Sequence, residues 1–166
     1  LRTIFIKMYT DAGIIGIGEG TVEGRIATVM AAIKQIEPYL IGKDPRMPAH
    51  HWQAIYRHAF YRGDIVLTSA LGAVDIAMWD IKGKALNLPV WALAGGYRPR
   101  VPTYASGALM RTFPLDHLLK AGPKLKEKGF RQMKTQLGGN ARPEQEVERI
   151  KLMRESIGYD TDLMCD

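Results

Sequence analysis

The 166-residue chain has one cysteine, Cys165, and no long run of apolar residues. A lone cysteine excludes an internal disulfide, which fits the reducing environment of the cytoplasm. A membrane-spanning helix needs about 18 or more consecutive apolar residues, and the sequence contains no such run. The segment from Leu1 to Tyr9 carries Arg2 and Lys7 within a strand-like alternation, which is unlike a signal peptide. We therefore predict a cytoplasmic protein without a membrane partner.

Basic residues are numerous but form no cluster along the sequence. The 23 Lys and Arg residues are interspersed with 17 Asp and Glu residues, which leaves a net charge of +6. The sequence has no run of about five to eight basic residues of the kind that nucleic-acid-binding segments contain. We therefore expect no nucleic-acid partner. With 46% hydrophobic and 24% charged residues, the composition is that of a globular protein with a substantial core.

The first half of the sequence predicts a β-hairpin followed by helices. Apolar residues alternate from Ile4 to Met8, a glycine-containing turn follows, and isoleucine then alternates with glycine over 15–18. Apolar spacing then predicts three helices, at 26–40, 51–60 and 70–86. Thr68 or Ser69 is the expected N-cap of the third helix, whose apolar stripe and alanines indicate that it is largely buried.

After the two glycines at 95 and 96 the pattern changes to alternating strands and helices. The expected elements are strand 101–105, helix 115–128, strand 131–137, a helix from Pro143 and strand 162–166. The buried stripe of the second helix is expected to consist of Val147, Ile150, Met153 and Ile157. Strands that alternate with helices in this way imply a parallel sheet with right-handed crossovers.

A row of polar residues lies on the second of these strands. Side chains of a strand in a parallel barrel alternate between the outer helices and the barrel axis. Arg131, Met133, Thr135 and Leu137 form the set expected to meet the helices. This turns Gln132, Lys134 and Gln136 inward, and the same alternation on 162–166 brings Asp166 toward Lys134. The alternative interpretation is a solvated lysine and an aspartate without a role.

The stretch ALGAVDIAMWDIKGKALNLPVWALAGG, at 70–96, resembles the signature region of a known enzyme family. The family is the mandelate racemase and muconate lactonizing enzyme branch of the enolase superfamily. The matching residues are Ala70, Asp75, Ala77, Asp80, Gly83, Lys84, Pro89, Leu93 and Gly95, while Met78 and Ala94 depart at apolar positions. The segments EGRIATV, YLIGKDP and FYRGD are similar to the acid-sugar dehydratases of that superfamily, in particular the galactonate dehydratase kind.

The resemblance implies an α/β protein with two domains. An α+β capping domain, residues 1–98, would precede the first strands and helices of a modified (β/α)₈ TIM barrel, residues 99–166. By this resemblance the sequence begins at the second capping strand and ends before five of the eight barrel strands. We therefore expect it to be the N-terminal part of an enzyme.

The resemblance also assigns roles to individual residues. Lys134 matches the first lysine of the family's Lys-x-Lys motif, and Asp166 matches the first of three carboxylate ligands to an essential Mg²⁺. Gln136 stands where the motif has its second lysine, and an amide cannot act as a base. Tyr61 and Arg62 match a capping-domain loop that contacts the substrate.

Other charged residues are given no catalytic role. Asp75 and Asp80 of the signature are interpreted as structural, because buried carboxylates are usually paired. The histidines match no catalytic position of the family; they are His50, His51, His58 and His117. His50 and His51 do not suggest a metal site, because adjacent side chains point apart.

The function implied by the resemblance is a Mg²⁺-dependent acid-sugar dehydratase. Such an enzyme removes the proton α to a carboxylate, passes through an enediolate and eliminates water to give a 2-keto-3-deoxy acid. The expected base is a histidine beyond residue 166. Because the sequence holds one of the three metal ligands, the chain by itself is expected to be inactive. Relatives commonly assemble, which implies a homo-oligomer. A racemase, epimerase or cycloisomerase of the same superfamily and a non-catalytic interaction module remain as alternatives.

Overall fold

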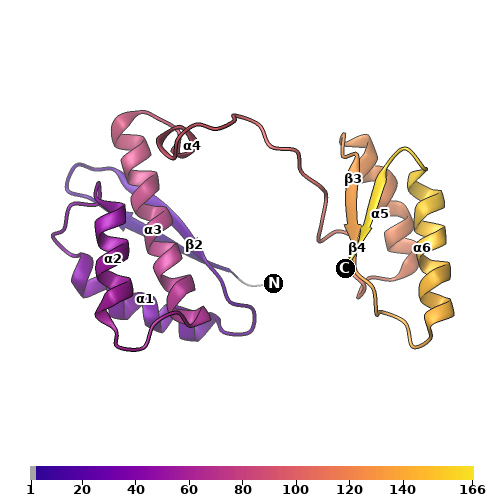
Figure 1. The fold of residues 1–166 in the computed structure, drawn as a ribbon, viewed down its shortest axis with the longest axis horizontal. Helices are drawn as coiled ribbons and strands as arrows, with labels where there is room; N and C mark the ends of the chain where they lie inside the picture. The colour runs from indigo at the N-terminus through magenta and orange to yellow at the C-terminus, as the bar shows by residue number, and fades with distance from the viewer. Residues whose placement is uncertain (1–2) are drawn as a thin grey trace. The chain divides into compact units, whose positions relative to one another are not determined.

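The computed structural model describes residues 3–166, and residues 1 and 2, including Arg2, lie outside the described part. The chain forms two compact units, Leu1–Pro99 and Arg100–Asp166, each with its own core (Figure 1). No helix within residues 3–166 is long and apolar enough to cross a membrane.

The first unit consists of a two-stranded sheet and a group of helices. Its elements are β1 (Ile4–Tyr9), β2 (Ile15–Gly20), α1 (Ile26–Leu40), α2 (Pro48–His58), α3 (Ile65–Leu86) and the short α4 (Val90–Leu93). β1 and β2 pair antiparallel, with Ile4 opposite Gly20 and Tyr9 opposite Ile15, which confirms the predicted hairpin. The bounds of α1 also agree with the prediction. α2 begins at Pro48, three residues before the predicted start, because proline suits the first turn of a helix.

The alternation of isoleucine and glycine on β2 allows α3 to lie directly on the sheet. A Cβ atom added to Gly18 would come within 1.9 Å of the carbonyl oxygen of Ala73, and one added to Gly16 within 2.2 Å of that of Ala77. Only glycine leaves room for the helix backbone at these positions. The sequence pattern therefore reflects close packing of a helix on a strand as well as strand alternation.

α3 starts earlier than predicted and has a different N-cap. The helix begins at Ile65, and the Asp64 carboxylate accepts the backbone N–H groups of Val66 and Leu67 at 2.7 and 2.9 Å. The prediction of a cap at Thr68 or Ser69 was therefore wrong, because Asp64 already satisfies the free N–H groups of the first turn. The prediction that α3 is largely buried is confirmed. Its buried side chains include Ala70, Leu71, Ala73, Val74, Ala77, Met78 and Ile81.

The second unit contains α5 (Leu115–Glu127), β3 (Gln132–Thr135), α6 (Pro143–Ile157) and β4 (Asp162–Cys165). β3 and β4 are parallel neighbours, with Lys134 opposite Met164. The core of this unit consists of Ala105, Leu109, Leu118, Met133, Met153 and Ile157. The elements form an open sheet, and residues 3–166 contain no closed barrel.

Two predictions for the second unit need correction. The strand expected at 101–105 is reduced to a single parallel bridge between Ala105 and Met133. Pro102 has no N–H to donate and the Val101 side chain is exposed, so neither the hydrogen bonds nor the burial of a strand develops there. On α6, Val147 is 54% exposed, whereas Arg149 takes a place on the buried face with Met153 and Ile157.

Candidate functional site

β3 separates its side chains onto two faces as the sequence pattern predicts. Met133 and Thr135 are fully buried, and the Thr135 hydroxyl lies 3.7 Å from the Met153 sulfur of α6. Lys134 and Gln136, at the intervening positions, are only half-buried. The apolar face of the strand therefore meets the helices, and the polar face is left for other contacts.

Lys134 and Asp166 meet at the carboxyl ends of the two parallel strands. The Lys134 ammonium lies 2.7 Å from Oδ2 of Asp166, and their side chains are 27% and 58% exposed. The main chain holds the same two strand ends together, because the Leu137 N–H donates to the Asp166 carbonyl at 2.7 Å and the Asp166 N–H to that of Thr135 at 3.1 Å. The structure thus brings together two of the residues that the sequence singles out.

Each member of the ion pair shifts the pKa of the other toward its charged form. The hydrogen bond and positive charge of Lys134 lower the pKa of Asp166, and Arg111 adds a smaller effect in the same direction. The same hydrogen bond raises the pKa of Lys134. The ion pair therefore favours an ammonium on Lys134 and a carboxylate on Asp166.

Gln136 follows β3 directly and continues its polar face. Its N–H donates to the Leu109 carbonyl at 3.4 Å, and its own carbonyl accepts a hydrogen bond from Arg149 at 2.7 Å. The position of Gln136 is thus set by main-chain contacts to a loop and to α6. Its side-chain amide can donate or accept a hydrogen bond, but it cannot remove a proton from carbon.

Tyr61 and Arg62 belong to the other unit, in the loop between α2 and α3. Tyr61 is 83% exposed, and the Arg62 side chain donates to the Ala59 carbonyl at 3.2 Å. Both border a cavity of about 380 Å³ between α1, α2 and α3. Its apolar walls include Ile36, Ile55, Leu67 and Leu71. Both residues are therefore exposed to solvent and also line this cavity.

Asp166 is the sequence-predicted metal ligand, and its surroundings show how far the described residues fit a metal ion. Asp166 offers a carboxylate oxygen, which is a ligand type that Mg²⁺ prefers. Within residues 3–166, however, no group of three or more His, Cys, Asp or Glu side chains converges. His51 is buried between the Tyr39 hydroxyl at 2.9 Å and the Asp44 carbonyl at 2.8 Å, so it is a structural residue. Asp166 therefore fits one position of a Mg²⁺ site and no more.

Two residues near the ion pair were not singled out from the sequence. Arg111 lies in the loop after Ala105, donates to the Leu137 carbonyl at 3.4 Å and lowers the pKa of Asp166. Tyr104 contributes to the raised pKa of Lys134. No local pattern marks either residue, since both are far from Lys134 in the sequence.

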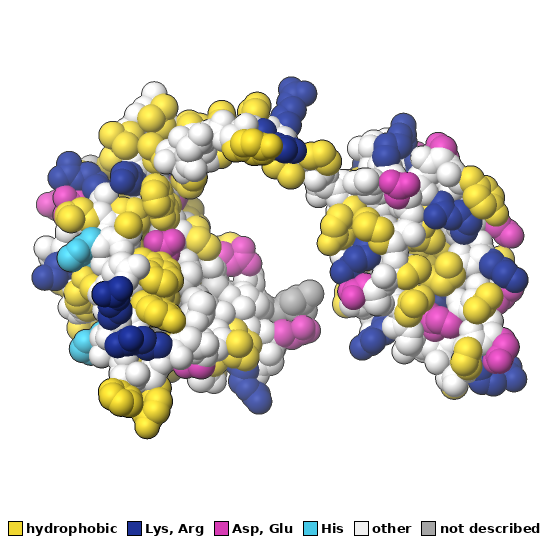
Figure 2. All heavy atoms as spheres, viewed as in Figure 1, with side chains coloured by type: hydrophobic (Ala, Val, Ile, Leu, Met, Phe, Trp, Pro, Cys, Tyr) yellow, Lys and Arg dark blue, Asp and Glu magenta, His cyan; other side chains and the backbone are white. Residues whose placement is uncertain are grey.

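Basic and acidic side chains are intermixed over the molecular face shown in Figure 2.

Comparisons with known proteins agree with these observations. Residues 1–95 match the model of the family described as mandelate racemase / muconate lactonizing enzyme, N-terminal domain. The chain is 51% identical over 105 residues to D-galactonate dehydratase of Klebsiella pneumoniae (strain 342), a match that covers 63% of this chain and 28% of that enzyme.

Two solved structures have the same fold over the whole chain or nearly so. The 3,6-anhydro-D-galactonate cycloisomerase of Zobellia galactanivorans is 34% identical, with a TM-score of 0.87 over 100% of this chain and 46% of its own. A racemase of Streptomyces coelicolor A3(2) with bound magnesium is 33% identical, with a TM-score of 0.85 over 99% and 46%. The chain therefore spans less than half the length of these proteins.

Proposed function

The chain belongs to the mandelate racemase / muconate lactonizing enzyme family of the enolase superfamily, and from this premise we propose that it carries part of the active site of an acid-sugar dehydratase. Residues 1–98 form the capping domain, and residues 99–166 form the first strands and helices of a modified (β/α)₈ barrel. The enzyme removes the proton α to the carboxylate of an aldonate and eliminates a β-hydroxyl as water. The product is a 2-keto-3-deoxy acid.

The observation that carries this proposal is the 2.7 Å contact between Lys134 and Asp166. Both residues lie at the carboxyl ends of neighbouring parallel strands, where enzymes built on (β/α)₈ barrels have their active sites. A lysine cation beside a carboxylate that can bind a metal suits a substrate with a carboxylate of its own. Similarity to a D-galactonate dehydratase at 51% identity favours an acid sugar as that substrate.

Each residue has a role that follows from its chemistry. Loss of the α-proton places negative charge on the substrate carboxylate, and the Lys134 ammonium, which the ion pair with Asp166 favours, stabilises this charge. Gln136 donates a hydrogen bond from its amide and removes no proton. Tyr61 and Arg62 contact the substrate from the capping domain.

Asp166 would provide one oxygen ligand to Mg²⁺. When bound, Mg²⁺ supplies further positive charge beside the substrate carboxylate. The ion pair with Lys134 lowers the pKa of Asp166 further and so favours its ionised form, which is the form that binds a cation. The relative from Streptomyces coelicolor contains bound magnesium, which supports this assignment.

A racemase or cycloisomerase is the second candidate, favoured by the two solved structures at 33% and 34% identity. A racemase that uses two bases needs one on each face of the α-carbon. Gln136 occupies the position of one such base in the family motif, so this chain favours elimination over two-base racemisation. A racemase or cycloisomerase converts one isomer into another without loss of water, whereas a dehydratase eliminates water.

The proposal is tested with a chimera of residues 1–166 joined to the matching C-terminal part of the Klebsiella dehydratase. The chimera is incubated with Mg²⁺ and a panel of aldonates, and keto acid is detected as its semicarbazone. Formation of a 2-keto-3-deoxy acid from at least one aldonate is the expected result. A folded, Mg²⁺-binding chimera that forms no keto acid overturns the proposal. Proton NMR in D₂O identifies a racemase, which exchanges the α-proton without loss of water.

A further inference from the structure

Arg149 is a buried cation that has no part in the reaction proposed above. It lies on α6, its side chain is 5% exposed, and it takes a place on the face that packs against the sheet. A buried guanidinium is destabilising unless its N–H groups and charge are satisfied. The partners that satisfy Arg149 therefore indicate what the residue does.

The first partner is the end of β3. The Arg149 guanidinium donates to the Gln136 carbonyl at 2.7 Å and contacts the Thr135 hydroxyl at 3.4 Å. That hydroxyl donates in turn to the Leu109 carbonyl at 2.9 Å, in the loop after Ala105. Carbonyls just beyond a strand have no ladder partner and need another donor. Arg149 is that donor for Gln136.

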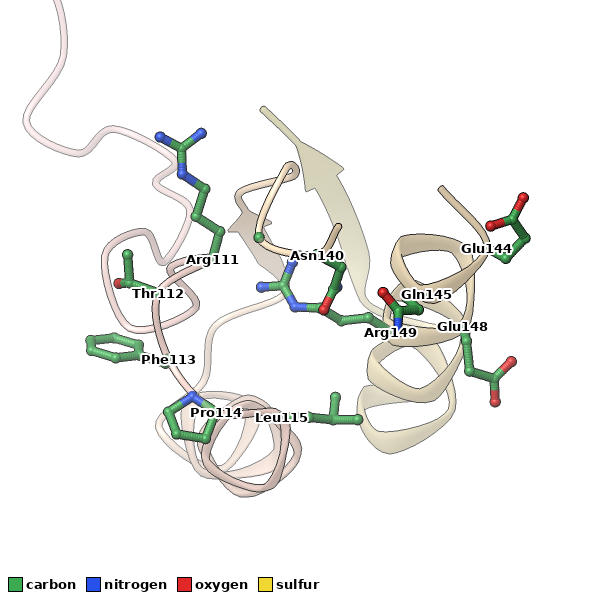
Figure 3. Close-up of a pocket in the computed structure, with 11 residues that line it drawn as sticks. Arg111, Thr112, Phe113, Pro114, Leu115, Asn140, Glu144, Gln145, Glu148 and Arg149 are labelled. Carbon is green, nitrogen blue, oxygen red and sulfur yellow. The ribbon is translucent and has the colours of Figure 1, made fainter. Parts of the chain in front are cut away.

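The second partner is Glu146, one turn earlier on α6. Its carboxylate accepts from Arg149 at 2.7 Å, and its other oxygen accepts from the backbone and side-chain N–H groups of Asn140 at 3.1 and 2.9 Å. Burial acts to raise the pKa of Glu146, but these hydrogen bonds hold it below the usual value. Figure 3 shows Arg149 reaching from α6 toward Asn140 along the wall of a cavity of about 590 Å³.

One peptide group links this network to the ion pair of the candidate site. The peptide between Gln136 and Leu137 is held at its carbonyl by Arg149 and at its N–H by the Asp166 carbonyl, both at 2.7 Å. Lys134 lies on the same short strand, two residues earlier. The orientation of this peptide therefore affects the positions of both Lys134 and Asp166.

We propose that Arg149 and Glu146 are positioning residues that fix the carboxyl end of β3 and the loop after it, and thereby the direction of Lys134 and Gln136. The inference rests on the site proposed above and adds to it the residues that hold that site in place. A purely structural ion pair would stabilise the whole second unit evenly. A positioning pair acts at the strand end, so its loss opens that end first.

The experiment measures amide hydrogen exchange by NMR on the 166-residue chain. Arg149→Met removes the guanidinium and keeps an apolar stem of similar length. The expected result is at least a tenfold loss of protection at the Gln136 and Leu137 amides relative to the Asp162 amide, which donates to Arg131 at the opposite end of the sheet. Arg149→Lys, which keeps one charged donor, is expected to restore part of the protection.

Arg154→Met is the matched control. Arg154 is also on α6 and donates to backbone carbonyls, but at Gly158 and Thr161, near the start of β4. Its loss is expected to expose Asp162 more than Leu137. If Arg149→Met does not fold, Glu146→Gln keeps the side-chain shape and is expected to lower protection at Asn140, Gln136 and Leu137 first.

A uniform loss of protection in the Arg149 or Glu146 variants, or no loss, overturns the inference. None of these measurements depends on turnover. An inactive chimera with the expected exchange pattern therefore contradicts the proposed function alone, whereas an active chimera with uniform exchange contradicts only the positioning role.

Discussion

Asp80 and Lys84 of α3 lie one helical turn apart and together satisfy the outer edge of β2. The Asp80 carboxylate accepts the N–H of Ile17 at 2.8 Å, and the Lys84 ammonium donates to the carbonyl of Ile15 at 2.7 Å. The two side chains also pair with each other at 2.7 Å. In an antiparallel pair, alternate residues direct their backbone groups away from the partner strand. These two side chains therefore satisfy backbone groups of β2 that a third strand would otherwise pair with.

Replacing Asp80 with Ala is expected to lower the free energy of unfolding of the first unit by about 1–2 kcal/mol, because the Ile17 N–H loses its charged acceptor. Urea unfolding followed by circular dichroism measures the change. Asp116→Ala is the control, since Asp116 pairs with Lys120 at the same spacing but at 3.8 Å and with both side chains exposed. It is expected to change stability by less than about 0.5 kcal/mol. Equal effects would show that Asp80 acts only as a surface charge.

The same contact predicts a pH dependence of stability. Burial acts to raise the pKa of Asp80, but the hydrogen bonds from Lys84 and the Ile17 N–H lower it below the usual value. A carboxyl with a lowered folded pKa stabilises the fold above its unfolded pKa of about 3.9, and this contribution is lost as pH falls through the folded pKa. The free energy of unfolding should therefore fall more steeply below about pH 5 in the natural chain than in Asp80→Asn. Parallel curves from unfolding at several pH values contradict this assignment.

Gly18 is expected to tolerate no side chain. A Cβ atom there would lie 1.9 Å from the Ala73 carbonyl, so α3 must move away from β2 in Gly18→Ala. We expect a loss of about 3 kcal/mol or more in the free energy of unfolding. Gly72→Ala is the control, because nothing lies within 4 Å of its Cβ position and alanine favours a helix by about 1 kcal/mol. Thermal unfolding that ranks Gly18→Ala at or above Gly72→Ala in stability is the contrary result.

Local patterns in the sequence are sufficient where the period of an element and the order of the elements determine its neighbours. The hairpin of β1 and β2 follows from alternation and a turn, and the bounds of α1 from apolar spacing. The two-residue period of β3 and its parallel pairing with β4 also predict that Asp166 lies near Lys134, and the two side chains are in contact. These inferences need only strand geometry and the order of the elements.

Other features depend on contacts that a local pattern does not contain. Val147 and Arg149 lie two residues apart on α6. Hydrophobicity alone predicts that Val147 is buried and Arg149 is exposed. Arg149 is buried instead because Glu146 and the Gln136 carbonyl satisfy it. The N-cap of α3 was missed for a different reason. Asp64 is an ordinary capping residue, but Thr68 and Ser69 are capping residue types too and lie directly before the predicted helix at 70–86.

Two buried threonines of the second unit are expected to respond oppositely to valine. Within residues 3–166, Thr161 has a buried hydroxyl without a hydrogen-bond partner, whereas the Thr135 hydroxyl donates to Leu109 and contacts Arg149. Thr161→Val should be neutral or stabilising, because an unsatisfied polar group is replaced by a methyl group. Thr135→Val should cost about 1–3 kcal/mol, because it leaves buried partners unpaired. Urea unfolding of both variants checks the order, and equal losses contradict it.

Lys134 is expected to act in the chimeric enzyme through its charge. Lys134→Met removes the cation beside the substrate carboxylate and should lower kcat by roughly 10²–10³, the effect typical of one lost electrostatic contact in an active site. Lys134→Arg keeps a cation near Asp166 and should retain more activity than Lys134→Met. Lys128→Met, an exposed position at the end of α5, serves as the control and should leave kcat unchanged. Steady-state kinetics that show equal activity for Lys134→Met and Lys128→Met would remove Lys134 from the catalytic site.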